Sequence, residues 1–179
     1  PFRPGVSIIG EGDVGINYGT IQPNVKVLND AAAGVGVTST LPESDGVVRR
    51  VPLLSMSQGE YYPSFSMEML RAISGDPSYQ AKINETGVEA LRIPSFNTIK
   101  TDEYSRVFVN WNYKFTQFDI GDKTPDLLNK IVILGVTASG VANPVATPVG
   151  AQFPQAVQAN LLQTLINGDT VSIPNWAGI

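Results

Sequence analysis

The sequence predicts an α/β fold: a central mixed sheet with flanking helices, arranged as a three-layer, sandwich-like single domain. The main observation is the stretch KIVILGVTASGVANPVATPVGAQFPQAVQANLLQTLING at 130–168. Its apolar run 131–134 is typical of a strand buried on both faces. A polar loop at 135–152 and a helical pattern at 153–166 follow. The stretch is therefore expected to form one strand–loop–helix crossover, with the central strand first.

The helical pattern at 153–166 is the second observation. A spacing of three or four residues places large apolar side chains on one stripe of the helix, formed by Phe153, Val157, Leu161, Leu165 and Ile166. Ala156 and Leu162 lie beside this stripe. Pro154 suits the first turn, where its missing N–H costs nothing. Asn167 and Gly168 form a stop signal, so the helix should end there.

The third observation is a predicted antiparallel hairpin at 35–56. Strands at 35–40 and 48–56 flank a turn at 43–46, in which Asp45-Gly46 is the strong signal. Pro52 would interrupt a central ladder, which favours an edge or bulged strand. A second turn is expected at 58–60.

A second amphipathic helix is predicted from Pro63 to about Ser74. Its apolar side chains are Phe65, Met69 and Ile73, with Leu70 nearby, and 75–77 should end it. We expect irregular or edge structure at 1–23, a short helix at 25–33 capped by Asn24, and a loop at 78–89. Strands at 91–93 and 106–111 should flank the turn-rich 97–104, and 112–125 should link to the central strand.

Composition limits the function. The chain has 179 residues, a net charge of −4 and an apolar fraction of 42%, as expected for one globular domain. It contains no His and no Cys, which removes the residues of Ser-His-Asp and Cys-His catalysis and the commonest transition-metal ligands. No basic cluster exceeds two residues, which argues against nucleic-acid binding. We expect no enzyme activity, cofactor or metal in this chain.

Candidate ligand-binding residues lie in the polar loop after the predicted central strand. Thr137, Ser139, Gly140 and backbone N–H groups could line a small-ligand pocket, and the alternative is a tight turn that packs on a neighbour. The loop lacks the Lys of a phosphate-binding loop. Ser139 has neither the nucleophile-elbow spacing nor a His to activate it. Asn143, Thr147 and Asn160 complete the candidate set around this loop and helix.

Arg49 and Arg50 are further candidates. Neighbouring residues on a strand point to opposite faces, so one arginine could reach Asp45 while the other meets an anionic ligand or a partner subunit. The alternative is an ordinary charged strand edge. Scattered carboxylates without calcium-loop spacing are assigned to solvated loops: Glu11, Asp13, Asp119, Asp122 and Asp126. Trp111, with Tyr113 and Phe115 nearby, is expected to fill a core or an interface.

Two pieces of the chain resemble the CHASE2 family of extracytoplasmic sensory domains. The first comprises IVILGVTASG at 131–140, TPVG at 147–150 and the Ala159-Asn160-Leu161-Leu162 step. The second is LPESDGVVRRVPLL at 41–54, followed by YPS at 62–64 and an amphipathic helix. The resemblance covers about 35–168. The chain departs from the usual pattern at Asn143, where Asp is common, and at Gln158, where His often precedes Ala-Asn.

The resemblance implies that residues 1–179 are most of a periplasmic sensor domain of a bacterial inner-membrane receptor. The family's first half and its anchoring helix would lie upstream, and 169–179, with Trp176, would be a juxtamembrane tail. An unknown small-molecule or physical signal would change the packing of the 153–167 helix, with Phe153 and Asn160 involved. The full-length receptor would be a homodimer and would act through a nucleotide cyclase. Alternatives are a histidine kinase, a diguanylate cyclase, a serine/threonine kinase, or a scaffold that binds no ligand.

Overall fold

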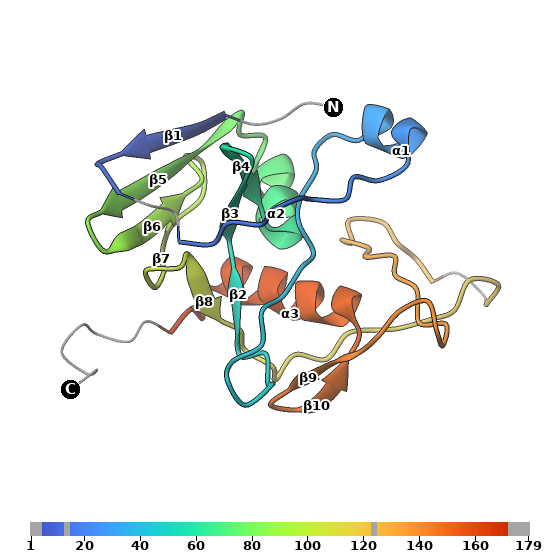
Figure 1. Ribbon diagram of the computed structural model, residues 1–179. Coiled ribbons are helices and arrows are strands. Elements are labelled where there is room, and N and C mark those ends of the chain that lie inside the picture. Colours follow the sequence, from blue (N-terminus) through green and yellow to red (C-terminus); the bar gives the residue numbers. More distant parts are fainter. Residues whose placement is uncertain (1–4, 13–14, 123–124, 172–179) are drawn as a thin grey trace.

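The computed structural model describes residues 5–12, 15–122 and 125–171, and these residues form an α/β arrangement around a mixed sheet (Figure 1). The fold class predicted from the sequence is therefore confirmed. Asp13, Trp176 and most of the predicted tail lie outside the described residues. The elements are β1 Gly5–Ile9, α1 Lys26–Ala31, β2 Arg50–Pro52, β3 Leu54–Ser57, β4 Glu60–Pro63, α2 Phe65–Ser74, β5 Ser78–Asn84, β6 Gly87–Arg92, β7 Thr98–Lys100, β8 Arg106–Phe108, β9 Val145–Thr147, β10 Gly150–Gln152 and α3 Pro154–Asn167.

The largest sheet has the strand order β1-β5-β6-β7. β1 runs parallel to β5 at the sheet edge, and the other pairings are antiparallel. The predicted loop at 78–89 is therefore wrong, because β5 and the first part of β6 occupy it. In β5 the buried Tyr79, Ala81 and Ile83 alternate with more exposed residues, which is the period of a half-buried strand.

The predicted hairpin between 35–40 and 48–56 is also wrong. Val37 makes only an isolated parallel bridge to Ser64, whereas β2 pairs with β8 and β3 pairs with β4. The two strands separate at Leu53, whose N–H bonds to Ser105 at 2.8 Å and whose carbonyl accepts from Ser64 at 2.8 Å. The interruption expected beside Pro52 is present. The turns predicted at 43–46 and 58–60 are confirmed.

Helix α2 is confirmed, although its buried face differs from the predicted stripe. Ser64 caps the start by accepting the Met67 N–H at 3.2 Å, and Gly75 ends the helix with a φ of 71°. Ile73, predicted to face the core, is 58% exposed. The buried face instead includes Glu68 and Arg71, because their charges pair with each other at 2.8 Å inside the protein.

Helix α3 follows the prediction closely. Pro154 lies at the start, Gly168 ends the helix with a φ of 70°, and Val157, Leu161 and Leu165 are buried. Ile166 departs from the stripe, being 38% exposed. α3 packs on α2, where the Ser66 hydroxyl lies 2.6 Å from Gln158 Oε1 and 2.8 Å from its carbonyl. The short helix α1 also exists, but Val25 rather than Asn24 is its N-cap.

The predicted central strand at 131–134 is wrong. These residues have no secondary structure and lie on the opposite side of the molecule from the four-stranded sheet (Figure 1). Ile131 is 47% and Leu134 77% exposed. A strand buried on both faces needs a hydrogen-bonded neighbour, and no strand of the described residues pairs with this segment. The loop that follows contains the β9–β10 hairpin.

Candidate functional site

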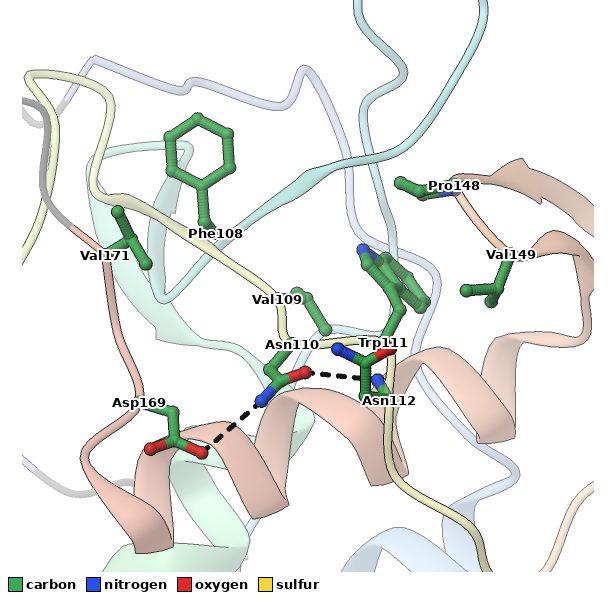
Figure 2. Close-up of a pocket in the computed structure, with 9 residues that line it drawn as sticks. All are labelled: Phe108, Val109, Asn110, Trp111, Asn112, Pro148, Val149, Asp169 and Val171. Carbon is green, nitrogen blue, oxygen red and sulfur yellow. Dashed lines mark hydrogen bonds between the residues drawn. The ribbon is translucent and has the colours of Figure 1, made fainter.

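A surface pocket of about 410 Å³ lies where three segments of the chain meet. One wall is the end of β8 and the residues after it, the second is the turn between β9 and β10, and the third is the chain that leaves α3 (Figure 2). The lining residues are Phe108, Val109, Asn110, Trp111, Asn112, Pro148, Val149, Asp169 and Val171.

Backbone anchors fix these walls. The Asn110 N–H donates to Thr164 Oγ1 at 3.0 Å, and this hydroxyl donates to the Asn160 carbonyl at 2.7 Å, so the chain after β8 is held against α3. In the hairpin, Thr147 Oγ1 donates to the Gly150 carbonyl at 2.5 Å, and Gly150 has a φ of 105° that favours glycine. The tight turn presents Pro148 and Val149 to the pocket (Figure 2).

The polar wall is organised around Asp169. Its carboxylate accepts from Asn110 Nδ2 at 3.4 Å (Figure 2). It also accepts from the Tyr113 hydroxyl, and that hydroxyl accepts from Asn167 Nδ2 at 3.2 Å. The Tyr113 bond, followed by weaker contributions from Asn110 and Asn167, lowers the pKa of Asp169. Asp169 is the one ionisable side chain among the described residues that line the pocket. The pocket therefore carries a negative charge at neutral pH.

The remaining wall is apolar and aromatic. Phe108 and Trp111 supply two ring systems, and Val109, Pro148 and Val149 add aliphatic surface. The sequence predicted that Trp111 fills a core or an interface; the structure places it partly buried in the pocket wall. Such a combination of apolar surface with a few convergent polar groups is typical of small-molecule sites.

The candidate residues of the polar loop lie elsewhere. Thr137, Ser139 and Gly140 are exposed in a turn closed by the Val141 N–H on the Ala138 carbonyl at 3.1 Å. The exposed Asn143 does not line the pocket either.

Thr147 and Asn160 are buried supports rather than lining residues. Thr147 shapes the turn that carries Pro148, and Asn160 Nδ2 donates to the Ala156 carbonyl at 2.8 Å. Among the described residues, Asn160 Oδ1 has no hydrogen-bond partner. Sequence reasoning missed Asn110, which lies inside the strand predicted at 106–111, and Asp169, which comes just after the predicted helix and its stop signal.

The two arginines point to different partners. Arg49 binds Asp45 through two hydrogen bonds of 3.0 and 2.7 Å, as predicted for one of the pair. Arg50 donates twice to Glu43 at 2.7 Å and once to Asp102 at 2.8 Å, and its guanidinium lies 5.3 Å from the centroid of the Phe108 ring. Arg50 thus belongs to a charge-paired cluster behind the pocket wall.

The ion pairs of Arg49 and Arg50 predict that the stability of the fold decreases at low pH. Arg49 lowers the pKa of Asp45 to about 2, and Arg50 lowers that of Glu43. A carboxyl with a depressed pKa stabilises the fold above its unfolded-state pKa, and the contribution disappears as pH falls through the folded-state pKa. The urea midpoint should therefore be constant from about pH 7 to 5 and fall between about pH 4 and 2.

The variant Asp45→Asn should reduce this acid-dependent fall, because it removes one of the groups that titrates. Asp126→Asn is the matched control, since Asp126 is an exposed carboxylate that accepts the Leu128 N–H at 3.0 Å. Urea titrations at four pH values measure both. If the urea midpoint of Asp45→Asn fell at low pH as much as that of the unmodified protein, Asp45 would not contribute to the pH dependence.

Comparison with known proteins gives the family. Within the described ranges no cluster of potential metal ligands occurs, and no helix there is long and apolar enough to cross a membrane. Neither a curated protein nor a solved structure matches the chain. The family model described as the CHASE2 domain matches residues 7–179. The chain therefore belongs to the CHASE2 family, whose members are non-catalytic extracytoplasmic sensory domains of receptors.

Proposed function

We propose that this chain is the signal-input domain of a bacterial inner-membrane receptor and that it senses a small molecule in the pocket beside Asp169. The position of the pocket carries the proposal. Its walls come from β8, from the β9–β10 turn and from the chain that leaves α3. A bound molecule would contact the end of α3 and the rest of the domain at the same time, so its binding energy could favour one arrangement of α3.

The receptor is proposed to be a homodimer, tethered to the membrane by segments that flank this domain, with residues 169–179 as the juxtamembrane tail. Its cytoplasmic output is proposed to be a nucleotide cyclase, with a kinase or a diguanylate cyclase as the other outputs. Support comes from the sensory role of the family and from the position of the pocket, whose lining residues Asp169 and Val171 are among the first residues of the tail. A ligand would act on α3, in which Asn160 is buried and Phe153 is the N-cap residue.

A thermal melt with a panel of periplasmic metabolites tests ligand sensing. A ligand at 100 times its Kd stabilises the folded state by about 2.7 kcal/mol, which raises the melting temperature of a domain of this size by about 5–10 °C. Val149→Trp, which fills the pocket mouth, should abolish that shift. Val27→Trp is the matched control, because Val27 in α1 is 77% exposed and does not line the pocket.

A receptor readout completes the test. In the full-length receptor, Val149→Trp should also remove the response of cyclase activity to the same compound, while Val27→Trp should respond normally. If the compound shifts both variants equally, the pocket is not the sensory site. If no compound shifts the unmodified domain and Val149→Trp leaves the receptor's response intact, the proposal fails.

One observation favours a second function, a constitutive dimerisation module without a ligand. The segment 128–141 exposes several large apolar side chains, namely Leu128, Ile131, Val132, Leu134, Val136 and Val141. Large exposed apolar surfaces often mark a protein–protein contact. A second copy of the chain would cover them. In that case the melting midpoint would rise with protein concentration alone, and Ile131→Lys would remove this rise in sedimentation and melting experiments.

A further inference from the structure

We infer that the pocket binds a small organic cation, an amine with a partly apolar carbon skeleton. The inference rests on the proposed function, because it names the chemical class of the molecule that the pocket would sense. Three features carry it: the charge of the polar wall, the rings of the apolar wall and the size of the pocket.

The charge comes from Asp169. Its hydrogen-bond donors, Asn110 Nδ2 and the Tyr113 hydroxyl, are neutral, so they stabilise the carboxylate without cancelling its charge. Among the described lining residues none is a Lys or Arg. Arg50 lies behind Phe108, but Glu43 and Asp102 both bind its guanidinium. The net field at the polar wall is therefore negative, which attracts cations and repels anions.

The end of α3 strengthens this field. Aligned peptide dipoles give the carboxyl end of a helix a partial negative charge, and α3 ends at Asn167, two residues before Asp169. Gly168 and Asp169 N–H groups bond the last carbonyls at 3.2 and 3.1 Å, so the chain turns there and the carboxylate stays next to the helix end. A cation at Asp169 would interact favourably with both the carboxylate and the helix.

The apolar wall and the volume select an organic cation over a metal ion. Phe108 and Trp111 offer ring faces or edges to a ligand, and ammonium groups are attracted to the faces of aromatic rings. A hard metal ion requires about six oxygen ligands, whereas this pocket supplies one carboxylate and two carboxamides. Its volume of about 410 Å³ lies within the range of small-molecule sites.

The test uses three probes that share a phenylethyl skeleton and differ in charge: 2-phenylethylamine, 2-phenylethanol and 3-phenylpropionate. Isothermal titration at low salt should show that the amine binds at least about tenfold more tightly than the alcohol, and that the carboxylate binds most weakly. Asp169→Asn should weaken amine binding at least about tenfold and leave the alcohol within about twofold. Raising the salt concentration should weaken only the amine.

Asp30→Asn is the matched control, because Asp30 is an exposed carboxylate paired with Lys26 in α1, and α1 lies away from β8 and the β9–β10 hairpin (Figure 1). It should leave all three affinities unchanged. Equal binding of amine and alcohol, an unaffected amine affinity in Asp169→Asn, or no binding of the amine would each overturn the cation inference. Ligand sensing itself is judged separately by the metabolite panel and Val149→Trp, so the two failures are distinguishable.

Discussion

Glu68→Gln is expected to lower the free energy of unfolding by about 3–5 kcal/mol, because it leaves a buried arginine without its counter-charge. The side chains of Glu68 and Arg71 are 5% and 6% exposed. Arg71 donates to both Glu68 oxygens, at 2.8 and 3.0 Å, and to the Ala33 carbonyl at 3.3 Å. The Tyr79 hydroxyl also donates to Glu68. The Glu68–Arg71 ion pair therefore joins α2, β5 and the segment before Gly34.

The control is Glu89→Gln, which removes the same charge from an exposed pair. Glu89 and Lys82 lie 2.9 Å apart and are 47% and 58% exposed, so the loss should be at most about 0.5 kcal/mol. The double variant Glu68→Gln/Arg71→Met should recover much of the loss, because it removes the isolated charge. Urea denaturation at pH 7 measures all three. A loss below about 1 kcal/mol for Glu68→Gln would mean that water compensates the charge.

The same network explains how residues near 34 are held without forming a strand. A Cβ at Gly34 would lie 1.6 Å from Glu68 Oε1 and 2.5 Å from its Cδ, so only glycine allows the carboxylate its position. Gly34→Ala should therefore displace Glu68 and destabilise the protein through the same pair. The sequence showed Gly34 only as the end of a helix, since its contact partner lies 34 residues away.

Local signals were sufficient for helices and turns. Gly75 and Gly168 end α2 and α3 as predicted, because a left-handed residue after a helical pattern satisfies the last carbonyls. Asp45-Gly46 likewise placed a turn correctly. These features depend on residues within a few positions of one another. The buried Glu68 was not predictable in this way, because its stabilising contacts include Tyr79 on another element.

Strand pairing and the pocket depend on residues far apart in the chain. The run 131–134 has the composition of a buried strand, yet composition does not supply a neighbouring strand. β2 pairs with β8 rather than with the nearby 35–40, across about fifty residues. In the pocket, Asn110 meets Asp169 across 59 positions, with no motif that links them. The helices and turns were therefore more predictable than the pairing of strands and the contacts between residues far apart in the chain.

Leu161→Ala is the second large effect, with an expected loss of about 2–5 kcal/mol in the free energy of unfolding. Leu161 is fully buried on α3, within the core that also contains Val157 and Leu165. Truncation would remove buried apolar surface and leave a cavity beside α2, since well-packed interiors relax only partly. Urea denaturation followed by tryptophan fluorescence and circular dichroism would measure the loss.

Leu134→Ala is the matched control and also decides how 131–134 behaves in solution. Leu134 is 77% exposed, so the same truncation should change the free energy of unfolding by less than about 0.5 kcal/mol. A loss near that of Leu161→Ala would show that 131–134 is buried, as its apolar sequence first suggested. If that loss appeared only at high protein concentration, a second copy would be what buries the segment, because only association makes stability depend on concentration.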